Sequence, residues 1–320
     1  MGVVKKIAIG LGGLIGVLVV AGAGAYVWAG SAASSKLANT YTIKASTFPV
    51  PWPLTGDSLR SAESEQVALD SAVARGKHLV EARYVCVECH STNFGGGTMI
   101  DDPAIGTLLG PNLTMGAGSR TVQYTAADWD RIVRHGVKPD GRPAVMPSED
   151  YFALSDRELS DIVAYIRSLP PVDNTVPAPT FGPVGKMLIA TGQFKLSADM
   201  HPSAHEGAHA VLPPAEAPNA EFGKHLAQVC TGCHLPSFAG GPIIGGPPDW
   251  PPAANLTPAG LVGWTYTDFE RAMREGVRKD GTKLREPMAL MPKYAKNMTD
   301  IEMQALWAYI STVPAVASAK

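Results

Sequence analysis

The chain has 320 residues, of which 45% are hydrophobic and 18% charged, and its formal net charge is −2. This length suggests about two domains of ~150 residues each, and the hydrophobic content argues against wholesale disorder. A near-neutral charge excludes a general nucleic-acid binder, because such proteins are normally basic. The 33 glycines and 27 prolines predict long, turn-rich connections.

The first element in chain order is an uncharged apolar segment from Ile7 to Gly30. A helix over these residues rises ~1.5 Å per residue and would cross a bilayer core of ~30 Å. Lys5 and Lys6 precede it, which predicts a cytoplasmic N-terminus and places the rest of the chain on the other side of the membrane. A cleaved signal peptide is the alternative, although the apolar core of a signal is usually only ~7–15 residues long.

Two similar blocks follow, and we place them at residues 66–172 and 220–320. Both contain GKHL, C-x-x-C-H, Asn-Leu-Thr, Met-Pro and Ala-Tyr-Ile in the same order. The second copy of each motif comes about 145 residues after the first, a domain-sized period that indicates duplication. Residues 31–65, first rich in small residues and then in proline, are predicted to be a juxtamembrane linker, and the proline-rich residues 173–219 an extended connector.

Each block ends in a predicted helix. In the first block, Ser155 and Glu158 form a capping box, and an apolar stripe at helical spacing runs from Leu159 to Ile166. In the second, Thr299 and Glu302 form the same box. No strand pattern of comparable strength is present. The sequence therefore predicts an all-α fold, with one N-terminal transmembrane helix and two small, loop-rich domains.

The chemistry is carried by the two C-x-x-C-H motifs. They consist of Cys86, Cys89 and His90 in the first block and of Cys230, Cys233 and His234 in the second. This spacing is the attachment motif for c-type haem, in which the thiols form thioethers to the porphyrin and the histidine ligates the iron. A thioredoxin-like dithiol lacks the trailing histidine, and a zinc site would need the two cysteine pairs to converge from separate repeats.

The second axial ligand of each iron is predicted to be a methionine. Met146 and Met291 occupy matched positions before the last helix of their blocks, and a proline follows each. A thioether sulfur suits haem iron and raises its reduction potential. Met288 is an alternative to Met291. The metal ligands predicted from the sequence are thus His90, Met146, His234 and Met291.

With these motifs, each block resembles a class I cytochrome c domain. Residues 66–320 resemble the membrane-anchored dihaem cytochromes c that act as subunits or partners of bacterial dehydrogenases and respiratory complexes. The resemblance implies that the carbonyl of Pro111 accepts a hydrogen bond from the iron-ligating histidine, with Ala254 at the corresponding position of the second copy. It also implies that Gly76 and Gly223 lie where the first and last helices of each domain cross.

The predicted function is electron transfer by a membrane-tethered protein that carries two covalently attached haem c groups and is not itself an enzyme. The resemblance implies a single-pass anchor in a bacterial inner membrane, with the haem domains in the periplasm. Its donor would be a dehydrogenase or quinol-oxidising complex, and its acceptor an oxidase or soluble cytochrome. We expect no nucleic-acid partner, and the chain would act alone or as a subunit of a larger complex. The alternative is a haem enzyme with one open iron, such as a dihaem peroxidase.

Two further groups of histidines are not assigned to this function. His201, His205 and His209 are interpreted as part of a solvated connector, and His78 and His225 as residues of helix surfaces.

Overall fold

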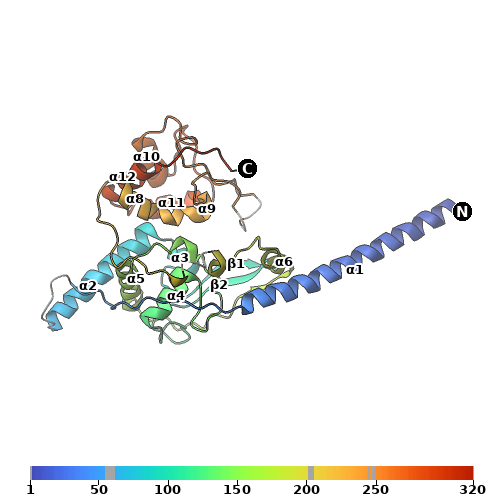
Figure 1. Ribbon diagram of the computed structural model, residues 1–320, viewed down its shortest axis with the longest axis horizontal. Helices are drawn as coiled ribbons and strands as arrows, with labels where there is room; N and C mark the ends of the chain where they lie inside the picture. The colour runs from blue at the N-terminus through green and yellow to red at the C-terminus, as the bar shows by residue number, and fades with distance from the viewer. Residues whose placement is uncertain (1, 55–61, 201–204, 244–245, 247–248, 320) are drawn as a thin grey trace.

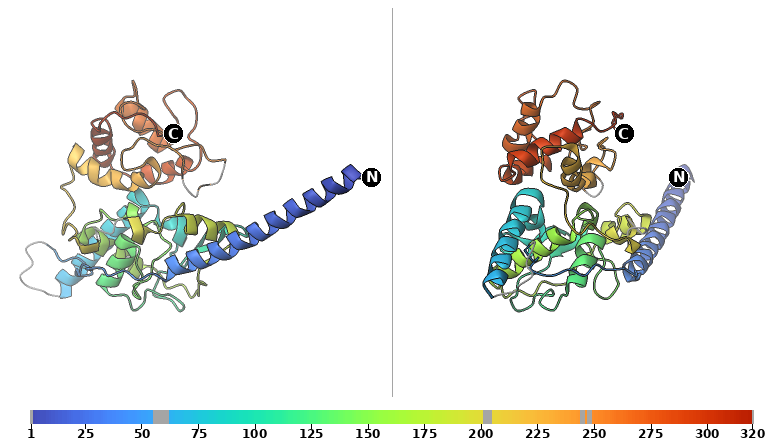
Figure 2. Two further views of the ribbon diagram at one scale, coloured as in Figure 1. Left: turned by 45° about the vertical axis from the view of Figure 1, so that its right-hand side comes forward. Right: turned by 60° about the vertical axis from the view of Figure 1, so that its left-hand side comes forward.

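The computed structural model describes residues 2–54, 62–200, 205–243, 246 and 249–319. Two compact bodies lie one above the other, and a long helix projects from the lower one (Figure 1). The two turned views separate the bodies in the same way (Figure 2). Helices dominate both bodies, which confirms the predicted all-α class, and the small sheet described below is an addition to it.

The projecting helix is α1 (Gly2–Ala38). Among the described residues it is the one helix long and apolar enough to cross a membrane, with a mean hydropathy of 2.2. The helix continues beyond Gly30, so residues expected to begin a linker are helical instead. Ala29 and Ala33 are buried where this end of α1 packs against α6 (Pro183–Thr191). Lys36 Nζ donates to the carbonyl of Ile189 at 3.0 Å and fixes the contact.

The segment after α1 also differs from a free linker. Phe48 is 8% exposed. The backbone N–H of Ser46 donates to Asp130 at 2.8 Å, and the Ser160 hydroxyl donates to the carbonyl of Pro49 at 2.6 Å. Residues 39–54 are therefore fastened to the first domain, while residues 55–61 of the predicted linker lie outside the described part.

The first domain is built on a close helix crossing. Its helical elements are α2 (Ala62–His78), the π-helical turn η1 (Leu79–Arg83), α3 (Cys86–His90), α4 (Ala126–His135), the 3-10 turn η2 (Ser148–Asp150) and α5 (Asp156–Ser168). A Cβ on Gly76 of α2 would collide with the backbone carbonyl of Asp161 in α5, so only glycine allows the two backbones to approach this far. Arg75 adds two hydrogen bonds of 2.7 Å to the Asp161 carboxylate.

The second domain repeats this arrangement. Its elements are α8 (Ala220–Leu226), η4 (Ala227–Cys230), α9 (Thr231–His234), α10 (Tyr266–Glu275), η5 (Met288–Leu290), α11 (Met291–Ala295) and α12 (Asp300–Ile310). Gly223 lies where α8 crosses α12, and a Cβ there would meet the carbonyl of Ala305. The repeated sequence motifs thus correspond to repeated packing.

The connector is structured and covers the first domain. Strands β1 (Gly97–Asp102) and β2 (Gly106–Gly110) are antiparallel, and β3 (Thr180–Phe181) of the connector adds to β2, with Gly106 opposite Phe181. Helices α6 and α7 (Ser197–Met200) follow. His205 is 5% exposed and the side chain of His209 is 4% exposed, which corrects their interpretation as solvated residues; His201 lies outside the described residues. Strands this short carry almost no periodic signal, which explains why the sequence did not predict them.

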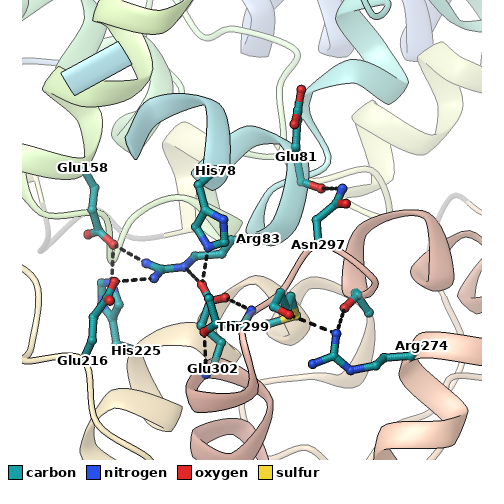
Figure 3. A network of polar contacts seen from close by, with 12 residues as sticks. His78, Glu81, Arg83, Glu158, Glu216, His225, Arg274, Asn297, Thr299 and Glu302 are labelled. Carbon is teal, nitrogen blue, oxygen red and sulfur yellow. Dashed lines mark hydrogen bonds and ion pairs between the residues drawn. The ribbon is translucent and has the colours of Figure 1, made fainter. Parts of the chain in front are cut away.

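Reciprocal histidine–glutamate contacts join the two domains (Figure 3). His78 Nε2 lies 2.9 Å from Glu302 Oε1, and His225 Nε2 lies 2.8 Å from Glu158 Oε1. The GKHL histidine of each copy therefore binds the capping-box glutamate of the other copy. This finding corrects the interpretation of both histidines as residues of helix surfaces.

Arg83 lies between these two pairs (Figure 3). Its guanidinium contacts Glu302, Glu158 at 3.4 Å and Glu216 at 2.9 Å, and its side chain is only 6% exposed. Burial alone would raise the pKa of Glu302, but the hydrogen bond from His78 and the charge of Arg83 lower it to about 2. The segment between GKHL and the next cysteine is three residues longer in the first copy than in the second, and Arg83 lies in this longer segment. One arginine therefore contacts the capping-box glutamates of both domains.

Candidate functional site: the two C-x-x-C-H turns

The first motif forms the short helix α3. The helix ends at Ser91, whose positive φ of 62° turns the chain away directly after the histidine. His90 is 8% exposed, and its Nδ1 lies 2.9 Å from the carbonyl of Pro111. Because a carbonyl only accepts hydrogen bonds, Nδ1 must carry the proton. The opposite nitrogen, Nε2, then has the lone pair that a metal ligand needs.

The second motif has the same geometry. Leu235 follows the histidine with φ of 65°, and His234 is 3% exposed. Its Nδ1 lies 2.7 Å from the carbonyl of Ala254. The change from proline to alanine keeps this bond because the acceptor is a backbone atom. Burial lowers the pKa of both His90 and His234, which favours the neutral, ligating form of the imidazole.

The Asn-Leu-Thr motif supports each histidine-binding loop. The Asn112 amide donates to the carbonyls of Val172 at 2.6 Å and Asn174 at 3.1 Å, and its oxygen accepts from the N–H of Thr114 at 3.0 Å. Asn255 makes the corresponding bonds to the carbonyl of Val316 and the N–H of Thr257. The repetition of the motif was visible in the sequence, but the backbone carbonyls that accept hydrogen bonds from the two asparagine amides lie about 60 residues further along the chain.

The four cysteines fit a site for covalent haem. No disulfide joins any of the four, and burial raises the pKa of the Cys86 and Cys230 thiols to about 12. Redox-active dithiols instead need a thiolate at neutral pH. In the described ranges the cysteines belong to no cluster of potential metal ligands, which argues against the zinc alternative. Each turn thus offers two thiols and one oriented imidazole.

The methionines that the sequence singled out lie in the apolar clusters around the motifs. Met146 packs into the cluster that also includes Cys86 and Leu113. Met291 and Met288 pack into the cluster that includes Cys230. All three are half-buried.

Each C-x-x-C-H turn also contacts the other domain. The Asp150 carboxylate in η2 abuts Gly232, and a Cβ at position 232 would collide with it. In the opposite direction, Glu88 accepts hydrogen bonds from Lys293 Nζ at 2.6 Å and from Tyr294 Oη at 2.5 Å, both in α11. In each copy, the segment that follows the matched methionine therefore lies against the attachment turn of the other copy. Nothing in the local sequence indicated these contacts.

Comparison with known proteins agrees with this geometry. A model of the cytochrome c family matches residues 73–170 and 220–314, which include both motifs. The chain belongs to the cytochrome c family. This protein thus contains two cytochrome c domains, carries two covalently attached haem c groups and functions in electron transfer.

Several relatives of this dihaem cytochrome c are named as cytochromes c or as cytochrome subunits of dehydrogenases. It is 27% identical to a diheme cytochrome c-type of Cereibacter sphaeroides, over 72% of this chain and 82% of that protein. It is 24% identical to the fructose dehydrogenase cytochrome subunit of Gluconobacter japonicus, over 82% of this chain and 58% of the relative. It is 25% identical to the cytochrome c subunit of the quinone-dependent alcohol dehydrogenase of Gluconobacter oxydans, over 81% and 58%. The chain spans less than two thirds of these two dehydrogenase subunits.

Proposed function

We propose that this dihaem cytochrome c is the membrane-tethered electron-transfer subunit of a periplasmic dehydrogenase. It would take single electrons from the dehydrogenase, or from a quinol-oxidising complex, and deliver them to an oxidase or soluble cytochrome. The names of the relatives support the dehydrogenase as partner. The apolar helix α1 and the lysines before it support a single-pass anchor with a cytoplasmic N-terminus.

The observation that carries the proposal is that each attachment turn contacts the other domain. Asp150 abuts the second turn, and Lys293 and Tyr294 bind Glu88 of the first. Both turns therefore face the domain interface, and an electron that enters one domain would leave through the other. When bound, each haem supplies a single Fe(II)/Fe(III) couple.

Residues of the chain itself would orient and shield the two irons. The backbone carbonyls of Pro111 and Ala254 hold the rings of His90 and His234, and we propose that Met146 and Met291 would supply the second ligand of each iron. The apolar clusters around the cysteines exclude water from the sites. The ion pairs of Arg83 with both domains oppose relative rotation and so support a constant separation of the turns.

The anchor would be a stiff extension of the first domain. At ~1.5 Å per residue α1 reaches about 55 Å, whereas a bilayer core is ~30 Å thick. The part of α1 that exceeds the thickness of the bilayer core corresponds to its C-terminal end, which packs against α6. We therefore propose that the first domain stays at a fixed height above the membrane.

A redox titration of the full chain in detergent tests the proposed function. We expect two low-spin haems per chain, each with the absorption band of methionine-ligated Fe(III). Met146→His and Met291→His should each remove that band from one haem and lower its potential, because imidazole replaces a thioether. Met288→Leu is the matched control and should leave both bands intact.

Two results would contradict the proposal. A high-spin haem that binds peroxide in the unmodified chain would favour the haem-enzyme alternative. Loss of the second band in Met288→Leu, but not in Met291→His, would transfer the ligand assignment to Met288. Partner choice is tested separately, by reduction of the cytochrome on addition of a membrane fraction and the sugar or alcohol substrate of a dehydrogenase.

A further inference from the structure

A second cluster of potential ligands lies away from both attachment turns, where the connector meets the first domain. His135 ends α4, and His205 and His209 come from the connector. His135 Nε2 lies 3.0 Å from His209 Nε2, and His135 Nδ1 lies 3.1 Å from His205 Nδ1. Asp130, one turn earlier in α4, lies 3.6 Å from His135 and 3.8 Å from His209.

Three of these residues meet the geometric requirement for one ion. One ligand atom each from Asp130, His135 and His209 lies within 4.8 Å of the other two. Asp130 and His135 are fully buried, and the His209 side chain is 4% exposed. Metal–nitrogen bonds of ~2.0–2.1 Å would bridge the 3.0 Å separation of the two Nε2 atoms. Two imidazoles and one carboxylate form a donor set for divalent first-row transition metals.

The hydrogen-bond partners orient two ring nitrogens towards each other. His205 Nε2 lies 2.9 Å from the carbonyl of Ala198, so this nitrogen carries the proton and Nδ1 accepts from His135 Nδ1. His209 likewise bonds the backbone of Phe152. The Nε2 atoms of His135 and His209 face each other at 3.0 Å, and both border the Asp130 carboxylate. A divalent cation placed among them would be bound by both nitrogens and by the carboxylate.

The charged side chains around this cluster also favour a bound cation. Arg134 is fully buried and pairs with both Asp130 at 2.6 Å and Asp156 at 2.8 Å. One positive and two negative side chains leave a net charge of −1 when the imidazoles are neutral.

Every candidate ligand is also held by an outer contact. His135 Nδ1 bonds His205, His209 bonds the Phe152 backbone, and Asp130 accepts from Arg134 and from the N–H of Ser46. Such outer contacts orient the ligands of natural metal sites. We propose that Asp130, His135 and His209 bind one divalent transition-metal ion, probed here as Zn²⁺, that fastens the connector to the first domain.

The second domain provides an internal comparison. Glu270 and Arg274 repeat the acid–arginine pair, at 3.2 Å, but Glu275 stands where the first domain has His135. No connector histidine reaches that place among the described residues. The ion pair therefore belongs to the fold of both domains, whereas the histidines are an addition to the first.

Zinc binding by the full, haem-loaded chain in detergent tests the proposal. After treatment with a chelator, the protein is titrated with Zn²⁺ at pH 7.5 by calorimetry, and retained zinc is counted by mass spectrometry. We expect one ion per chain, and X-ray absorption at the zinc edge should report two imidazoles with oxygen ligands. His135→Gln and His209→Gln should each weaken binding by at least about 100-fold, whereas His205→Gln, which removes an outer contact, should weaken it by about 10- to 100-fold.

His78→Gln is the control, because this imidazole lies at the domain interface, and it should bind zinc with unchanged affinity. Haem absorption and circular dichroism verify that each variant is folded. Absence of retained zinc in the unmodified chain would overturn the proposal, and so would an absorption spectrum without two imidazoles, whether or not a variant folds. Equal affinity in His209→Gln and the unmodified chain would overturn it as well.

Discussion

Glu302→Gln isolates the electrostatic contribution of the domain interface. Glutamine keeps the capping-box hydrogen bonds at the start of α12, because a neutral amide also serves at this position. The substitution removes only the negative charge that faces His78 and Arg83. The Glu302 side chain both caps α12 and pairs with Arg83, and this substitution removes the ion pair while it keeps the cap.

The magnitude follows from the pKa of this glutamate. Its ordinary value is 4.5, and the contacts with His78 and Arg83, together with a smaller effect of the capping N–H of Thr299, lower it to about 2. An acid whose pKa is lowered in the folded state stabilises the fold above its unfolded pKa, here by about 3 kcal/mol. The side chain is 1% exposed, so solvent screens the ion pair little. This stabilisation is lost as the pH falls from about 4.5 towards 2, when the carboxylate becomes protonated.

The assay is urea unfolding of the full chain, followed by circular dichroism between pH 2 and 7. At pH 7 the free energy of unfolding of Glu302→Gln should be about 3 kcal/mol below that of the unmodified chain, and the gap should close towards pH 2. Asp128→Asn is the matched control, because Asp128 holds the same capping-box position in α4 but pairs only within its own domain. A gap below about 0.5 kcal/mol at pH 7, or one independent of pH, would refute the reasoning.

Three further predictions concern the attachment sites and their supports. Asn112→Ala leaves the carbonyl of Val172 and the N–H of Thr114 without their partner, and should lower the free energy of unfolding by about 2–3 kcal/mol in urea titrations; an effect under 1 kcal/mol would mean that water replaces the amide. Gly223→Ala places a Cβ against the carbonyl of Ala305 and should cost roughly 1–3 kcal/mol, whereas Gly30→Ala in α1, with no neighbour within 4 Å, should cause no loss of stability. Burial, with the charge of Glu149 second, raises the pKa of Asp150 to about 8, so a rise in pH through 8 adds a negative charge beside the second attachment turn and should lower the potential of that haem. Asp150→Asn should abolish this pH dependence, and a slope that persists in the variant would assign it to another group.

The sequence predicted those parts of the site that depend on short spacings. The two C-x-x-C-H motifs identified the cofactor, because two thiols and a histidine at that spacing serve one attachment chemistry. The repeats identified two domains of one kind, and the boxes at Ser155 and Thr299 located the last helix of each, where the structure has both caps. These features could be predicted because their physical causes act within a few residues.

Interactions between distant residues escaped the same reasoning. His78 and His225 matched across the copies, yet only the tertiary structure paired each with the glutamate of the opposite domain. The inserted Arg83 had no repeated counterpart to draw attention to it. The prolines of the connector suggested a solvated segment, whereas β3, the buried His205 and the enclosed side chain of His209 fasten it to the first domain.

The sequence by itself determined that this chain holds two haem c groups in two helical domains, because attachment, capping and helix periodicity are local properties of the chain. Only the tertiary structure decided how the domains face each other and which charges are buried between them. Asp150 beside Gly232 and Tyr294 against Glu88 connect residues that are far apart in the sequence. Such contacts depend on the packing of whole domains, and no pattern within a few residues encodes them.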